Sequence, residues 1–304
     1  MQTKSRRFIA ADIIYILMMI LPILAGIVLK VLTTPLSNEI SIAGARIYFT
    51  LPAPIQNIII TEAQINSWLV MIAILGCCLF ITHGLKVRNI SVRQHLAEWI
   101  IEKVDGLVEN SMGTYFMGFS AFIAAILGLS AFSSLITLFG LYPPTSDLNV
   151  VAGWALLVFV LITYYKCKCG PIQYIKSFGD PVPFLAPLNI ISEIATPVSM
   201  AFRHYGNVLS GSVISVLIGF ALSSLSSLVL GWLPGFLGDI PFLQIGLPAV
   251  LSIYFDVFSG CLQAYIFAML TMMYVSGGFP MELYFEKQKN KKHKNKKTED
   301  FKVC

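Results

Sequence analysis

An arginine stands inside one of the most apolar stretches of this chain. The stretch is "SMAFRHYGNVLSGSVI", residues 199–214, where Arg203 is followed directly by His204. An arginine at the centre of a bilayer costs about 3 kcal/mol on insertion scales. It must therefore reach an end of its helix, pair with an acid or serve a function. An ionisable residue inside a membrane segment is a functional candidate by default, and the chemistry such residues commonly support is ion movement.

The arginine belongs to a stripe of polar residues at helical spacing. Spacings of three and four residues place the members on one helix face: Thr196, Ser199, Arg203, Asn207 and Ser210. Gly206 and Gly211 flank the stripe and allow another helix to approach closely. A second stripe follows in the last apolar block: Ser252, Asp256, Ser259 and Gln263, with Gly260 beside it. Asp256 is the only carboxylate between residues 240 and 281.

The direction of the two helices sorts these groups by depth. If the first helix leaves the cytoplasmic side, Asn189 and Glu193 lie inward of Arg203, and Ser212 lies outward. The last helix returns, so Asp256 lies outward of Gln263 by about 10 Å. This layout predicts two offset polar half-paths separated by a fixed positive charge. A structural ion pair between Arg203 and Asp256, which would simply join the helices, is the alternative.

Composition places the chain among polytopic membrane proteins. Of its 304 residues, 56% are hydrophobic and only 12% are charged, and the mean hydropathy is +0.76. A helix needs about 20 apolar residues to cross the hydrocarbon core. We expect an all-α fold of about six membrane helices, from the apolar blocks Phe8–Leu32, Ile65–Leu85, Tyr115–Leu141, Val150–Tyr165, 187–230 and 244–277.

The block 187–230 has no convincing break, although Pro197 could kink it. Forty-odd helical residues span about 60 Å, whereas the hydrocarbon core is about 30 Å thick. The block must either turn back near Gly219 or tilt steeply. The absence of a charged turn favours one steeply tilted helix, paired with the last helix at 244–277.

Basic residues set the expected orientation and the boundaries. They gather at the N-terminus, around 86–93, around 166–176 and in the C-terminal tail, which places both termini in the cytoplasm. We therefore divide the chain into an extra N-terminal membrane helix (1–33), an external loop (34–64), a membrane channel domain (65–286) and a basic cytoplasmic tail (287–304). Within the channel domain, 90–110 is expected to be an amphipathic helix on the inner membrane surface, and 187–277 a tilted helix hairpin.

Each of these assignments has an alternative. The first segment could be a signal peptide, although its apolar run is longer than usual and no clean cleavage site follows. The 90–110 helix could simply pack in a cytoplasmic loop. The basic tail could bind nucleic acid. However, it directly follows a membrane helix and is typical of the basic segment that stays on the cytoplasmic side of such a helix, so no nucleic-acid partner is expected.

No motif for a cofactor or a metal stands out. Cys167 and Cys169 form a C-x-C without a second pair, which is weak support for metal, and we treat all six cysteines as free thiols. The chain has no H-E-x-x-H, G-x-S-x-G or P-loop motif, so a membrane enzyme is disfavoured.

The sequence also resembles a known family. "FRHYGNVLSG" followed by "DVFSGCLQAYIFAMLTMMYV", with "PPTSDLN" and "APLNIISEIATPVSMAFR", is similar to the a subunit of F-type ATP synthases. The resemblance covers roughly 60–280 and is strongest over 185–212 and 250–275. It implies a non-catalytic stator subunit of the proton channel in a bacterial plasma membrane, with the ring of c subunits, the b subunits of the peripheral stalk and the lipid bilayer as partners.

The resemblance assigns roles to individual residues. Arg203 matches the family's essential arginine, which faces the c-ring, and Asn207 and Gln263 match polar positions near it. Asp256 lies where relatives often carry His or Glu, and Ser212 where many carry Glu or His. His204 replaces the usual leucine. The ion-translocation set is therefore Arg203, Asn207, Gln263, Asp256, Ser212, Glu193, Asn189 and His204.

Physics supports the implied mechanism. A ring carboxylate is neutral when it faces lipid, and a nearby arginine favours release of its proton to one half-path. The rival class is a self-contained secondary transporter or channel with an Arg203–Asp256 gate. Such transporters commonly contain internal repeats, and the 113–165 and 187–277 halves of this chain do not echo each other.

Overall fold

The chain forms two compact units. The computed structural model describes residues 2–33, 44–52, 54, 57–87, 91–168, 170–179, 183–230, 250–251 and 253–279, and the side chains of 2–9, 173, 177, 230 and 256 lie outside this description. One unit comprises Met1–Val151 with Phe202–Ala268, and the other Ala152–Ala201 with Met269–Cys304. Three helices contribute residues to both: α5 (Leu148–Cys167), α7 (Ala186–Leu230) and α10 (Gly260–Gly277).

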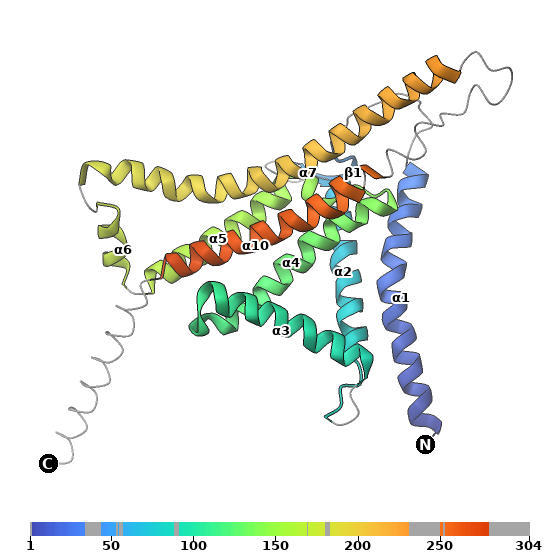
Figure 1. Cartoon of the computed structure of the whole chain (residues 1–304), viewed down its shortest axis with the longest axis horizontal. Helices are drawn as coiled ribbons and strands as arrows, with labels where there is room; N and C mark the ends of the chain where they lie inside the picture. The colour runs from blue at the N-terminus through green and yellow to red at the C-terminus, as the bar shows by residue number, and fades with distance from the viewer. Residues whose placement is uncertain are drawn as a thin grey trace. The chain divides into compact units, whose positions relative to one another are not determined.

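The first unit begins with two helices packed side by side. Helix α1 (Gln2–Thr33) lies along α2 (Glu62–Thr82) (Figure 1). Their backbones approach so closely at Gly76 that a Cβ there would lie 3.0 Å from the backbone nitrogen of Met19. An ion pair joins α1 to the helix that follows α2, α3 (Val92–Met112), because Asp12 Oδ2 lies 3.1 Å from Arg93 Nη1. The extra N-terminal helix is thus an integral part of this unit.

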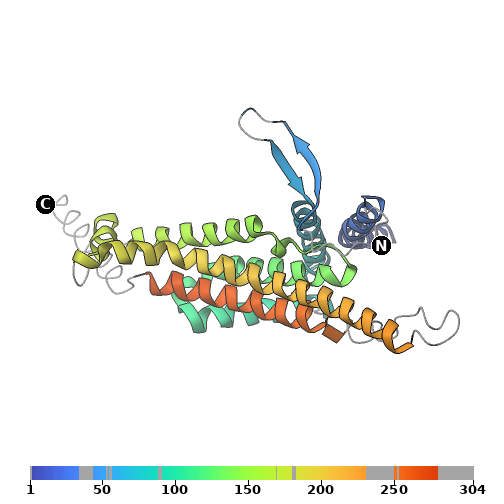
Figure 2. The same ribbon diagram turned by 90° about the horizontal axis from the view of Figure 1, so that it is seen from above.

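A small hairpin precedes α2. Strands β1 (Ile47–Leu51) and β2 (Ile58–Thr61) pair antiparallel, and the hairpin projects beyond the start of α2 (Figure 2). The sequence predicted only an external loop here. The strands are four and five residues long and most of their side chains are exposed, so they lack the apolar–polar alternation that marks a half-buried strand.

The middle of the first unit runs from α3 through α4 (Ser120–Leu135) to a short turn before α5. Ser91 caps α3 (Val92–Met112) by accepting from the Gln94 N–H, and Gly113, with φ of 85°, ends the helix. The elements that follow are η1 (Thr114–Phe119), α4 (Ser120–Leu135), η2 (Ile136–Phe139) and η3 (Pro144–Ser146). The predicted amphipathic helix is therefore α3, and its location on the inner membrane surface stays a prediction.

The second unit collects the parts of the chain around the expected inner half-path. Helix α5 (Leu148–Cys167), of which residues from 152 on belong here, is followed by α6 (Pro171–Ser177), η4 (Pro183–Leu185) and the first part of α7. The last turns of α10 complete the unit. Pro171 at the start of α6 suits a first helical position, where the missing N–H costs nothing.

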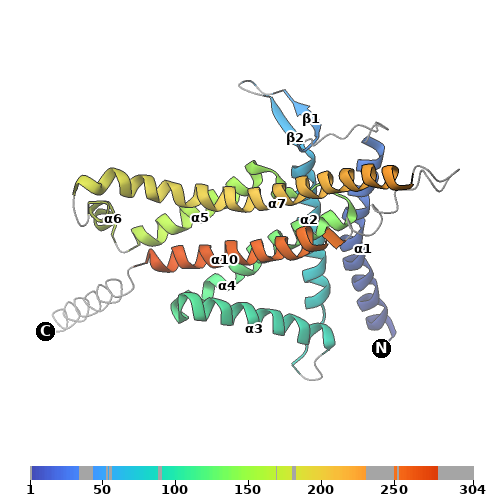
Figure 3. The same ribbon diagram turned by 45° about the horizontal axis from the view of Figure 1, so that its top comes forward.

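Helix α7 (Ala186–Leu230) is one uninterrupted helix of 45 residues (Figure 3). Its length is about 68 Å, more than twice the thickness of the hydrocarbon core. The alternative turn near Gly219 is excluded, because the helix continues through that residue. A helix of this length fits a bilayer only with a strong tilt.

Six helices of the described chain are long and apolar enough to cross a membrane. They are Ala10–Thr33, Glu62–Thr82, Thr114–Phe139, Leu148–Cys167, Pro183–Val229 and Ile253–Gly277. Large apolar side chains on these helices are exposed, among them Leu21, Leu157 and Phe220, as expected where lipid is the solvent. The prediction of an all-α polytopic membrane protein is confirmed.

Some predicted segments lie outside the described residues: 34–43 of the external loop, 231–249 before the last helix, and the basic tail after residue 279. Of the six cysteines, Cys77, Cys78, Cys167 and Cys261 are free thiols, whereas Cys169 and Cys304 also lie outside this range.

Candidate functional site

Arg203 lies on an exposed face of α7, within the first unit. Ser199, Asn207 and Ser210 are exposed on the same helix, so the polar stripe is not covered by the chain's own described residues. Within that described part no side chain forms a hydrogen bond or an ion pair with the Arg203 guanidinium. A cation in an apolar segment that its own chain leaves uncovered needs an anion from elsewhere or an aqueous path.

Asn207 and Gln263 join the two polar helices one turn beyond the arginine. Asn207 Nδ2 donates to Gln263 Oε1 at 3.2 Å, and Gln263 is only 2% exposed. The hydrogen bond satisfies a buried amide oxygen that would otherwise be costly in a membrane interior. The two residues that the sequence assigned to different stripes therefore meet.

His204 points away from this face and is fully buried. Its Nε2 lies 3.4 Å from Ser130 Oγ of α4, and its ring packs edge-on against Phe267 at a centroid distance of 5.6 Å. These contacts fasten α7 to α4 and α10. They favour a packing role for His204, rather than exposure to a moving ion.

The expected outer groups lie where α7 meets the start of the last helix. Asp256 falls within a π-helical turn, η5 (Ile253–Ser259), directly before α10 (Gly260–Gly277), and its side chain is outside the description. Such turns are rare and often occur at functional positions. Ser212 Oγ donates back to Leu209 O at 2.8 Å. Beside it, a Cβ on Gly211 would lie 3.3 Å from Phe255 Cβ, so glycine permits this close approach.

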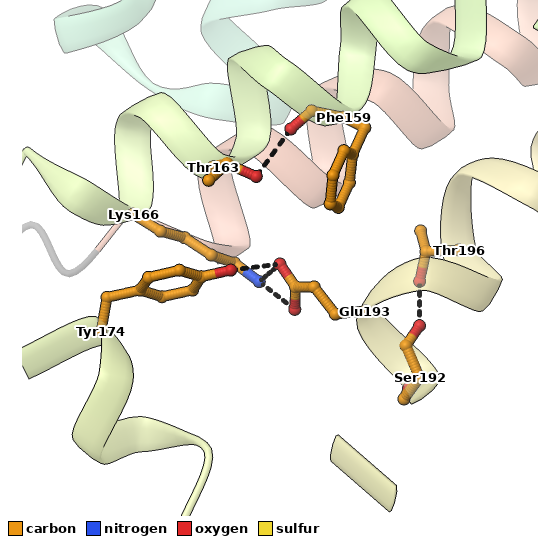
Figure 4. Close-up of polar contacts among 7 residues, drawn as sticks. All are labelled: Phe159, Thr163, Lys166, Tyr174, Ser192, Glu193 and Thr196. Atoms are coloured by element: carbon orange, nitrogen blue, oxygen red, sulfur yellow. Dashed lines mark hydrogen bonds and ion pairs between the residues drawn. The ribbon is translucent and has the colours of Figure 1, made fainter. Parts of the chain in front are cut away.

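Glu193, an expected inner group, lies in the second unit and is ion-paired. Lys166 Nζ is 2.7 Å from both Oε1 and Oε2 of Glu193, and Tyr174 Oη donates to Oε1 at 3.4 Å. Figure 4 shows the lysine and the tyrosine converging on the carboxylate from α5 and α6. Burial, together with this carboxylate, raises the pKa of Tyr174 above its ordinary value.

Asn189, the other expected inner residue, holds a loop. Its Nδ2 donates to Phe178 O at 2.9 Å, which ties α7 to the end of α6. Asn189 and Glu193 therefore share the second unit, whereas Arg203, His204, Asn207, Ser212 and Gln263 belong to the first.

A further polar cluster, which sequence reasoning missed, lies at the start of α2. Glu62 and Asn66 are buried, and Asn66 Nδ2 donates to Tyr142 O at 2.8 Å. Asp147 Oδ2 accepts from Thr61 at 3.5 Å. Burial, with nearby acidic groups, raises the pKa of Tyr142. The signal in the sequence was Glu62, a carboxylate in the first turn of an apolar helix. Such a residue more commonly stabilises the start of its helix than belongs to a buried polar cluster.

Two comparisons with known proteins place the chain. A family model described as "ATP synthase A chain" matches residues 64–276, the region from α2 to the last turn of α10. That range contains every predicted site residue and excludes α1, the hairpin and the tail.

Individual relatives agree with the family model. The chain is 31% identical to ATP synthase subunit a of Bacillus subtilis, over 68% of this chain and 89% of that protein. It is 31% identical to subunit a of Priestia megaterium, over 71% and 92%, and 29% identical to subunit a 1 of Crocosphaera subtropica, over 71% and 86%. The chain belongs to the ATP synthase A chain family.

Proposed function

We propose that this chain carries protons across a bacterial plasma membrane as the stator a subunit of a rotary F-type ATP synthase. It works in the complex against the ring of c subunits, is held by the b subunits of the peripheral stalk, and has no catalytic step of its own. Both termini lie in the cytoplasm. Family membership supports this function, and the names of the relatives agree with it.

The observation that carries the proposal is the exposed Arg203. A cation on an apolar helix is costly unless an opposite charge approaches it. A carboxylate on a neighbouring ring would supply that charge, and the arginine would favour loss of its proton. The exposed polar stripe is the surface on which such a ring would turn.

The other residues divide into two half-paths in this proposal. Asp256 and Ser212 line the outer path, and Asn189 and Glu193 the inner one. Arg203 separates them, so that a proton cannot pass directly from one to the other. Asn207 and Gln263 hold the two helices in register beside the arginine, and His204 anchors α7 from behind.

The decisive experiment removes the central charge. Arg203→Ala should abolish proton-driven ATP synthesis in membrane vesicles, while the complex still assembles. Asp256→Asn should slow proton uptake from outside, since the outer path loses its titratable member. Normal synthesis in a fully assembled Arg203→Ala complex would refute the proposal.

Purification separates the proposal from its rival. A stator subunit should co-purify with small helical-hairpin subunits of a ring. A self-contained transporter gated by Arg203 and Asp256 should instead move ions when reconstituted alone in liposomes.

A further inference from the structure

We propose that Lys166 is a positioning residue of the inner half-path, which holds the Glu193 carboxylate against the wall of a water-accessible cavity so that the path stays polar at this point. This inference rests on the proposed function. It adds a residue that the sequence marked only as one of several basic residues near a helix end.

The cavity lies entirely within the second unit and has a volume of about 210 Å³. Lys166 and Glu193 line it with Thr196, and the rest of its wall is Phe159, Ile162, Met273, Tyr274, Gly277 and Gly278. A space of this size has room for several water molecules, and the charged wall offers them hydrogen-bond partners. An apolar cavity of the same volume would stay dry.

The ion pair between Lys166 and Glu193 is largely buried and is held in one geometry by several contacts. The Lys166 and Glu193 side chains are only 24% and 18% exposed, and both carboxylate oxygens contact the ammonium group at 2.7 Å. Tyr174 adds a hydrogen bond from α6, so groups from two other elements fix the carboxylate on α7. Paired surface side chains, by contrast, are rarely held in one geometry.

The stem of the lysine is fixed as well. It lies against Gly278, where a Cβ would approach Lys166 Cε to 2.8 Å. A side chain at 278 would displace the lysine from its place beside Glu193. The glycine therefore makes room for the pair.

The pair keeps the cavity wall charged. Held by Lys166, the Glu193 carboxylate stays at the wall, where water in the cavity can hydrogen-bond to it. Without the lysine, only the longer hydrogen bond from Tyr174 would hold the carboxylate in place.

Thr196 connects the cavity to the stripe that the sequence predicted. It lines the same space as Glu193, one turn further along α7, and its Oγ1 donates back to Ser192 O at 3.0 Å (Figure 4). Its oxygen remains able to accept from water. The polar stripe thus begins at the cavity wall.

The test uses the whole complex in inverted vesicles and measures passive proton flux, per assembled complex, after removal of the catalytic sector. Lys166→Met should lower the flux severalfold, because the Glu193 carboxylate loses the group that holds it at the cavity wall. Lys166→Arg should restore the flux, because the charge is kept. Lys168→Met, which removes an exposed lysine two residues away, is the matched control.

A comparison of single and double variants separates the ion pair from packing. Glu193→Gln keeps the shape of the side chain but removes the charge that Lys166 holds, so it should lower the flux as Lys166→Met does. The double variant Lys166→Met/Glu193→Gln should then lose no more flux than either single variant. Losses that multiply in the double variant would overturn the inference, because the two residues would then act independently.

Two further outcomes decide the case. Flux in Lys166→Met equal to the Lys168→Met control would also overturn it, whereas equal flux losses in Lys166→Met and Lys166→Arg would show that only packing matters. The proposed function is judged separately by Arg203→Ala. If that variant blocks synthesis while Lys166→Met behaves as the control, only this inference fails.

Discussion

Gly260 is the position where the packing of the candidate site can be tested most sharply. It begins α10, three residues before Gln263, and faces Ser134 of α4. A Cβ at 260 would overlap the Cβ and Oγ of Ser134, and Ser134 is buried, with 3% exposure. Gly260→Ala must therefore push the two helices apart or force both into strained positions.

The size of the stability loss in Gly260→Ala follows from the cost of adding atoms to a close-packed interior. Inserting one methyl group where no space exists costs roughly 1–3 kcal/mol, whereas an alanine in a helix interior otherwise gains up to about 1 kcal/mol over glycine. We expect a net loss of up to about 2 kcal/mol of stability. We also expect lower proton flux, because the displaced helix carries Gln263 away from Asn207.

Heat inactivation of the assembled complex in membranes, scored by ATP-driven proton pumping, measures both effects. Gly128→Ala on α4 is the control, since a Cβ there meets nothing within 4 Å, and it should leave stability equal or slightly raised. Ser134→Gly should rescue Gly260→Ala by removing the atoms that clash. A Gly260→Ala complex as stable and active as the Gly128→Ala control, or a failed rescue, would contradict the packing described here.

Three further changes test other contacts. Gln263→Leu removes the acceptor of the Asn207 amide and should cost about 1 kcal/mol and slow proton flux; unchanged flux would show that this hydrogen bond is dispensable. Asp12→Asn breaks the ion pair with Arg93 and should lower the heat stability of the membrane-bound subunit; an undiminished stability would argue against the pair's role. The pKa of Tyr174 is raised above 10.0, so its stabilising effect is complete below pH 10 and is lost as pH rises through the raised value. Tyr174→Phe should reduce this alkaline loss in a pH series, and a profile matching the unaltered chain would count against it.

The sequence predicted the features that depend on one helix at a time. Hydropathy identified the spans, and spacing of three and four residues placed Ser199, Arg203 and Asn207 on one exposed face. The absence of a charged turn in α7 correctly favoured a single helix. These properties follow from local periodicity and composition, which a sequence displays directly.

Contacts between helices could not be predicted in the same way. Lys166 and Glu193 are 27 residues apart, and their meeting depends on the path of α6 and on the space that Gly278 leaves. The place of His204 in the ion-translocation set stays a prediction. Its contact with Ser130 of α4 could not be predicted, because it depends on how α7 packs against that helix. The hairpin was missed since its short apolar strands do not stand out in an apolar chain.

Some charges in the membrane segments are paired within the folded chain, whereas another has no such partner among the described residues. Folding therefore offsets part of the cost of placing charges in a membrane, and assembly is left to offset the rest. Asp12 is paired with Arg93 and Glu193 with Lys166, so these charges are compensated when the chain folds. The guanidinium of Arg203 has no such contact among the described residues and lies exposed on a membrane helix. In the proposed function, a carboxylate of another subunit offsets its cost of about 3 kcal/mol. The isolated subunit should consequently gain stability from Arg203→Ala, while the assembled complex should lose function; a variant that destabilised the isolated subunit would mean that the chain already compensates its own arginine.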